Sequence, residues 1–229
     1  MTYTLLIGDR IYSSWSLRGW LAFAAFGVPV EVRLAHMDSP EFREALADFA
    51  PARTVPALRV DGRGVIWDTL AIAETLAERY PDIAFWPGDA EARGLARAMA
   101  AEMHSGFAAL REACPMDLGA TVEGFVAPEA ALADLARIET LWAAARACAG
   151  RGRGPWLFGG YSLADVFYAP IAARIAAYGL PVSAEAEAYV AAHLAHPAFV
   201  EWRAAALADP HRHPMPGDAL PRRPWPGED

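Results

Sequence analysis

The sequence contains no lysine, no asparagine and no glutamine, so all 20 of its basic side chains are arginines. Without lysine, catalysis through a Schiff base and phosphate binding by a lysine-dependent loop are excluded. Without asparagine, the chain has no acceptor for N-linked glycosylation, and no site can use a neutral carboxamide side chain. Any chemistry must therefore rest on hydroxyl, carboxylate, imidazole, guanidinium or thiol groups.

Cysteine and long apolar runs are also scarce. Cys114 and Cys148 are the only cysteines, and such a distant pair fits free thiols in a reducing compartment, which favours a cytoplasmic protein. The net charge of -8 argues against a nucleic-acid partner, because phosphate binding relies on clustered basic residues. No run approaches about 18 apolar residues, so no membrane partner is expected. The first residues also lack the pattern of a signal peptide.

Hydrophobic residues make up 55% of the 229 residues, enough for one large or two small packed cores. The first third alternates between strand and helix patterns in the order βαβαββα. The last two thirds are Ala-rich and helical in pattern, and end in a proline-rich stretch that cannot form a compact helix. We therefore predict an α/β domain over residues 1–81, a linker over 82–89 and an all-helical domain with an extended C-terminal tail over 90–229.

The first candidate for chemistry is the sequence Tyr-Ser-Ser-Trp-Ser-Leu-Arg at residues 12–18, where a predicted strand gives way to a helix. Unpaired N–H groups and the macrodipole at a helix start favour a negative charge such as a thiolate. This turn holds no cysteine, so the thiol would have to arrive with a ligand. Ser13 or Ser14 could then donate its hydroxyl proton to the sulfur. Alternatively, these serines only cap the helix.

Two further segments are candidates for ligand binding. Val55-Pro56 stands at the start of a predicted strand, where its backbone could face a peptide-like ligand, although an ordinary edge proline explains it equally well. Asp68-Thr69 precedes the third predicted helix. The pair could bind the ammonium and carboxylate of an amino acid, or could simply cap the helix.

Together these segments resemble the N-terminal domain of the glutathione transferase superfamily. The sequence Ala-Pro-Ala-Arg-Thr-Val-Pro-Ala-Leu at residues 50–58 is similar to the family's Asn-Pro-…-Val-Pro-x-Leu segment. Residues 67–76 (Trp-Asp-Thr-Leu-Ala-Ile-Ala-Glu-Thr-Leu) resemble its Glu-Ser-x-Ala-Ile-x-x-Tyr-Leu segment. Residues 13–16 resemble the Ser-Ser-Cys-Ser turn of zeta-class enzymes, which include maleylacetoacetate isomerases.

The resemblance implies a thioredoxin-like N-terminal domain, an all-α C-terminal domain, glutathione as co-substrate and a homodimer. It assigns activation of the thiol to Ser13, and it implies a cis bond between Val55 and Pro56. The residues that it places around glutathione are Ser14, Trp15, Thr54, Val55, Pro56, Asp68 and Thr69. This chain departs from the family pattern at five positions, where Ala50, Thr54, Asp68, Thr69 and Trp15 replace Asn, Gln, Glu or Gln, Ser, and Cys.

The implied activity is attack of the glutathione thiolate on a small, hydrophobic electrophile, or its reversible addition in an isomerisation. A glutathione-binding or protein-interaction module without turnover is the alternative from another functional class. Thiol–disulfide exchange would need a cysteine in the turn, and serines stand there instead.

The second half of the chain supports the same family. Ser162 and Asp165 fit the family's capping box at the start of a buried helix, which is a structural role. His104, Phe107 and Arg111 are candidate contacts of the second substrate, although core packing explains them about as well. The pairs His193/His196 and His211/His213 have spacings that a metal could use, but no paired cysteine accompanies them, and we predict no metal site.

Overall fold

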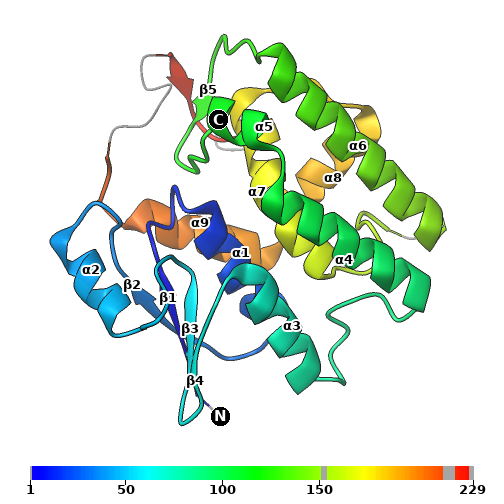
Figure 1. The fold of residues 1–229 in the computed structure, drawn as a ribbon. Helices are drawn as coiled ribbons and strands as arrows, with labels where there is room; N and C mark the ends of the chain where they lie inside the picture. The colour runs from blue at the N-terminus through cyan, green and yellow to red at the C-terminus, as the bar shows by residue number, and fades with distance from the viewer. Residues whose placement is uncertain (1, 151–153, 214–219, 227–229) are drawn as a thin grey trace.

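The computed structural model describes residues 2–150, 154–213 and 220–226. Its first part is a four-stranded sheet in the order β2-β1-β3-β4 (Figure 1). The strands are β1 (Tyr3–Ile7), β2 (Glu31–Leu34), β3 (Ala57–Val60) and β4 (Gly64–Trp67). β1 runs parallel to β2 and antiparallel to β3, so that Leu5 lies opposite both Val32 and Leu58.

Three helices cover the two faces of this sheet: α1 (Ser14–Ala24), α2 (Pro40–Ala47) and α3 (Thr69–Arg79). Because successive side chains of a strand point to opposite faces, β1 serves both layers. Leu5 and Ile7 pack in the main core with α1 and α3, whereas Leu6 packs with Ala45 of α2 and its neighbours. The sheet and its helices follow the predicted order βαβαββα.

The rest of the chain is mostly helical. Its helices are α4 (Ala90–Ser105), α5 (Ala108–Ala113), α6 (Glu129–Ala149), α7 (Leu163–Tyr178), α8 (Ala184–Leu194) and α9 (Pro197–Ala208). α7 lies in the middle, packed against α1, α4 and α8, and nearly all of its side chains are buried. No described helix is long and apolar enough to cross a membrane. This arrangement confirms the predicted thioredoxin-like domain followed by an α-helical one.

The described part of the C-terminal tail forms contacts that the sequence did not predict. Residues 214–219 and 227–229 lie outside the described part, but Arg222–Arg223 form a short strand, β6, which pairs with β5 (Thr121–Val122). Residues 209–213 follow α9 without regular structure. There His211 Nε2 lies 2.8 Å from Oδ1 of Asp38, which stands two residues before the start of α2 at Pro40. The described tail therefore contacts both parts of the fold.

The segment predicted as a linker lies between the end of α3 at Arg79 and the start of α4 at Ala90. Its Phe85 and Trp86 side chains are buried, and the carbonyl of Phe85 accepts the N–H of Leu163 at the start of α7. The segment is therefore packed against the helical part. The exact division into domains stays a prediction.

Candidate functional site

The N-terminus of α1 is built around Ser13, which occupies the capping position. Its Oγ accepts the backbone N–H of Ser16 at 3.2 Å, and its hydroxyl donates to the Ser16 Oγ at 2.8 Å. The Ser16 Oγ in turn accepts the N–H of Gly8 at the end of β1. The turn before Ser13 is held by the carbonyl of Asp9, which accepts the N–H groups of Tyr12 and Ser13. A network of short bonds thus fixes the start of this helix.

Ser14 is the first residue of α1 and is also buried. Its hydroxyl has no hydrogen-bond partner among the residues that the structure describes. From the sequence either serine could cap the helix, and the structure gives that position to Ser13. The two hydroxyls therefore differ, because only that of Ser14 is uncommitted.

A cavity of about 350 Å³ lies beside this helix start. It is lined by six residues predicted to bind glutathione and by two from the end of α4: Trp15, Thr54, Val55, Pro56, Asp68, Thr69, His104 and Ser105. The peptide bond between Val55 and Pro56 is cis, as predicted, and so is that between Ala50 and Pro51, which was not predicted. Three segments that are distant in sequence thus meet at one cavity. Ser13, Ser14, Phe107 and Arg111 are not among its lining residues.

His104 connects α4 to the start of α3. Its Nε2 lies 3.0 Å from Asp68 Oδ2, and its Nδ1 lies 3.4 Å from the Thr69 hydroxyl. The other carboxylate oxygen of Asp68 accepts the N–H of Leu70 and so caps α3. Asp68 has a φ of +79°, a conformation that is unusual for a residue with a side chain and that recurs at ligand sites. Asp68 therefore caps α3, one of the two roles expected from the sequence, and its second oxygen faces His104. Binding of an amino-acid head group by Asp68 and Thr69 stays a prediction.

The comparisons with known proteins agree with this geometry. The family model of the glutathione S-transferase N-terminal domain matches residues 12–79, which include all the cavity residues before α4. A glutathione transferase homologue from Burkholderia, solved with bound glutathione, is 26% identical, with a TM-score of 0.68 over 91% of this chain and 100% of that one. Residues 12–79 therefore form a glutathione S-transferase N-terminal domain, and the chain as a whole is similar to glutathione transferases.

Several of the proteins similar to this chain are named as isomerases. Maleylacetoacetate isomerase from Anaeromyxobacter dehalogenans, solved with bound glutathione, is 28% identical, with a TM-score of 0.62 over 88% of this chain and 94% of that one. A probable maleylacetoacetate isomerase from Caenorhabditis elegans is 37% identical over 97 residues, which are 42% of this chain and 44% of that protein. A maleylpyruvate isomerase from Ralstonia is 36% identical over 97 residues, 40% and 45% of the two chains. These matches span less than half of either curated relative.

Three arginines gather behind the cavity of this glutathione transferase homologue, on α1, α5 and α7. Arg18 is almost fully buried; its Nε donates to the carbonyl of Phe167, and one of its terminal nitrogens has no partner among the described residues. Burial, then the nearby Arg174 and Arg111, lower the pKa of Arg18 well below its usual value. Burial also lowers the pKa of Arg174 to about 10.

None of these three guanidinium groups has an ion pair with an acid in the described part of the chain. Those of Arg18 and Arg111 lie over the ring of Trp15, at 4.7 and 4.9 Å from its centroid. Trp15 thus contacts both the cavity and the arginines. Arg111 was predicted from the sequence as a substrate contact, whereas Arg18 and Arg174 were not, because no local pattern shows that an arginine on a helix is buried without an acidic partner.

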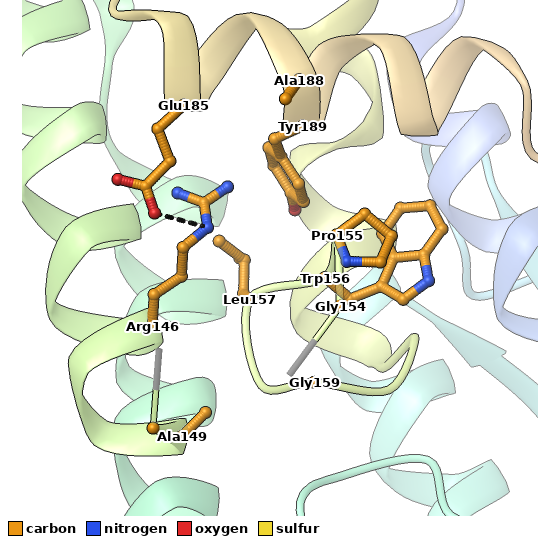
Figure 2. Close-up of a pocket in the computed structure, with 11 residues that line it drawn as sticks. Arg146, Ala149, Gly154, Pro155, Trp156, Leu157, Gly159, Glu185, Ala188 and Tyr189 are labelled. Atoms are coloured by element: carbon orange, nitrogen blue, oxygen red, sulfur yellow. Dashed lines mark ion pairs between the residues drawn. The ribbon is translucent and has the colours of Figure 1, made fainter. Parts of the chain in front are cut away.

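The remaining candidates lie elsewhere. Phe107 caps α5 with a left-handed backbone and packs in the core. His193 is fully buried, and His196 caps α9. A second cavity, of about 200 Å³, lies between α6, α8 and the loop after residue 154, with Arg146 and Glu185 3.4 Å apart at its side (Figure 2). It contains none of the residues predicted from the sequence.

Proposed function

We propose that this protein binds glutathione in the 350 Å³ cavity and activates its thiol at the N-terminus of α1. The observation that carries the proposal is that the predicted segments 15, 54–56 and 68–69 line one cavity beside a helix start. Solved relatives of similar sequence hold glutathione, which supports the same ligand here. The free N–H groups of the first turn would stabilise the thiolate electrostatically.

Ser13 is proposed as the hydroxyl that donates to the sulfur. Its capping role does not prevent this, since a hydroxyl can accept one hydrogen bond while it donates another. Its proton now faces the Ser16 Oγ, and a thiolate is a stronger acceptor than a neutral hydroxyl. Ser14, with an uncommitted hydroxyl, is the competing donor.

Replacing Ser13 by alanine is expected to raise the pKa of the bound glutathione thiol by about one to two units. The reason is that a hydrogen bond to a charged group contributes about 1.5–3 kcal/mol. The pKa would be taken from the pH dependence of the rate with a reactive electrophile. Ser13→Thr, which keeps both the hydroxyl and the cap, should restore the original profile.

Ser14→Ala is the matched comparison, because it removes the neighbouring hydroxyl from the same turn. We expect it to leave the thiol pKa in place. A shift with Ser14→Ala and none with Ser13→Ala would reverse the assignment. If neither variant changes the pKa, the backbone N–H groups of α1 activate the thiol alone.

Asp68 and Thr69 are proposed to bind the amino-acid end of glutathione. The Asp68 Oδ2 would accept a hydrogen bond from the ammonium group of the ligand. The Thr69 hydroxyl and the adjacent N–H groups would donate hydrogen bonds to its carboxylate. His104 lies against both side chains, so it would share Asp68 with the ligand or turn away. Thr54, Val55 and Pro56 would line the peptide part of glutathione, as the family resemblance implies.

For the second substrate we propose an electrophile that carries a carboxylate, whereas the sequence led us to expect a small, hydrophobic one. Three buried or half-buried guanidinium groups without an acid are costly unless an anion compensates them. The names of the isomerase relatives also refer to carboxylic acids, maleylacetoacetate and maleylpyruvate. Reversible addition of the thiolate, followed by its release from an isomerised product, is therefore the favoured reaction, with irreversible transfer as the second candidate.

Arg111→Met is expected to lower kcat/KM for a carboxylate-bearing electrophile about 10- to 100-fold, corresponding to the loss of a charged hydrogen bond of about 1.5–3 kcal/mol. Methionine keeps an unbranched apolar stem beside Trp15 but removes the charge. Steady-state assays with a maleyl keto acid and with a neutral nitroaryl halide would measure the effect. The rate with the neutral substrate should stay within twofold of the wild type. Equal losses with both substrates would contradict a carboxylate-binding role.

A module that binds glutathione without turnover remains the alternative from another class. It predicts retention on immobilised glutathione together with no activity towards either electrophile. Assembly as a homodimer is a further proposal from the family. Light scattering at micromolar concentration would test it, and a strictly monomeric mass would contradict it.

A further inference from the structure

Two histidines and three aspartates gather on the side of the sheet domain where the tail returns. His36 follows β2, and its Nδ1 lies 2.7 Å from Oδ1 of the buried Asp9. His211, in the tail, lies with its Nε2 3.8 Å from the same Asp9 oxygen and 2.8 Å from Asp38 Oδ1. His36 Nε2 is 3.8 Å from Asp209. The glutathione site proposed above uses none of these side chains.

The spacing of the donor atoms suits a small divalent cation. One donor atom each from Asp9, His36 and His211 lies within 4.8 Å of the other two. A tetrahedral ion with ligands at about 2.0–2.1 Å places them roughly 3.3 Å apart. The observed separations of 2.7 and 3.8 Å from Asp9 Oδ1 lie on either side of that value. Two imidazoles and a carboxylate are also a ligand set typical of zinc and other first-row metals.

The groups around the three ligands support the same interpretation. Three carboxylates, those of Asp9, Asp38 and Asp209, lie beside the two imidazoles, and a bound cation would offset this concentration of acidic groups. Asp209 lies near the second nitrogen of His36, where a carboxylate commonly orients a metal-bound histidine. Asp38 is positioned to supply a fourth oxygen or to hold a bound water near His211.

One local change is required. The rings of His36 and His211 are stacked, with 3.8 Å between their centroids and an angle of 22° between their planes. In this arrangement the two rings do not both direct a nitrogen lone pair at one ion. Each side chain is nearly 30% exposed, at 28% and 29%, which leaves room for the rings to turn about the Cβ–Cγ bond. The buried Asp9 needs no change, since its second oxygen is already fixed by the N–H of Met37.

We propose that Asp9, His36 and His211 form a binding site for one divalent transition-metal ion. The ion would join residues that are 175 positions apart, and so fasten the tail to the turn before α1. Because the carbonyl of Asp9 holds the N–H groups of Tyr12 and Ser13, the ion would also stiffen the turn that carries the proposed catalytic hydroxyl. This proposal departs from the sequence-based expectation of no metal, because it pairs His211 with His36 rather than with His213.

Calorimetric titration with Zn²⁺ of the full chain, prepared without a histidine tag, tests the site. A Cys148→Ser background removes the exposed thiol as a competing ligand. We expect one Zn²⁺ per chain with a dissociation constant in the micromolar range or below. His211→Ala and His36→Ala should each weaken binding at least tenfold, since even the loss of an outer partner of a ligand costs about that much. Co²⁺ should give the intense visible absorption of a four-coordinate site in the parent protein but not in the His36→Ala and His211→Ala variants.

His213→Ala is the matched control, because it removes a histidine two residues along the same tail that is outside the ligand set. It should bind Zn²⁺ as the parent does. The proposal is overturned if the parent takes up no Zn²⁺, if His211→Ala binds as tightly as the parent, or if His213→Ala loses binding to the same extent. His211 lies in an irregular tail segment, so its replacement should leave the helix content of the protein unchanged. An unchanged circular dichroism spectrum of His211→Ala would therefore separate loss of metal binding from loss of folding.

Discussion

Replacing Asp165 by alanine is expected to lower the free energy of unfolding by about 3–5 kcal/mol. This fully buried carboxylate accepts hydrogen bonds from the N–H groups of Leu157 and Ser162 and from the hydroxyls of Ser162 and Tyr189. Its removal leaves four buried donors without this partner, and each unpaired donor costs about 1–3 kcal/mol. Burial raises the pKa of Asp165, so the carboxylate tolerates its position only because of these donors. Urea denaturation at neutral pH measures the loss.

Asp89→Ala is the matched control. Asp89 caps α4 by accepting the N–H groups of Glu91 and Ala92, but it stands at the surface, where water replaces the lost bonds. We expect a loss of about 1 kcal/mol, as is usual for an exposed cap. Equal losses in the two variants would show that Asp165 acts only as a helix cap and not as the centre of a buried network.

Acid should destabilise this protein through the buried His193. The ring is fully buried, both of its nitrogens lack partners among the described residues, and burial lowers its pKa to about 3. In the unfolded chain the pKa of this histidine is about 6.5, so between pH 6.5 and 3 the unfolded chain binds a proton that the folded protein does not bind. The stability that depends on a neutral His193 is therefore present in full above about pH 6.5. Below that pH the free energy of unfolding falls by about 1.4 kcal/mol per pH unit, until the pH approaches 3.

His193→Leu removes this proton uptake while keeping an apolar side chain among Trp156, Tyr161 and Tyr189. Unfolding free energies of both proteins at pH 7, 6, 5 and 4.5 would separate its effect from that of the carboxylates. The advantage of the leucine variant should grow with each step below pH 6.5. A constant difference across this range would show that the folded protein also binds the proton.

The fold was predictable because its signals are local. Alternating and helical periodicities predicted the order of the sheet domain, and the structure moves the ends by only a few residues. For example, β3 begins at Ala57 rather than at Pro56, since proline has no N–H for the ladder. The box at Ser162 and Asp165 likewise marked the start of α7. The pairing of β5 with β6 was missed, because two-residue strands have no period to detect.

The candidate site was predictable only in part. Thr54, Asp68 and their neighbours were found because they stand in short motifs, and the structure brings them to one cavity. The contact of His104 with Asp68 depends on how α4 crosses α3, which no local pattern records. The same holds for the approach of His211 to Asp9, since nothing in the sequence specifies where an irregular tail comes to lie.

Helix α1 has a further consequence, because it belongs to both parts of the protein. Its Arg18 donates to the carbonyl of Phe167 inside α7, and its Trp20 packs against Trp202 of α9, whose indole nitrogen bonds the carbonyl of Arg10. A fragment cut after α3 would lose the hydrogen-bond partner of Arg18 and would expose the face of Trp20 that packs against Trp202. We therefore expect the two halves to unfold as a single cooperative unit, and a chimera that exchanged either half between relatives would have to carry matching partners for Arg18 and Trp20.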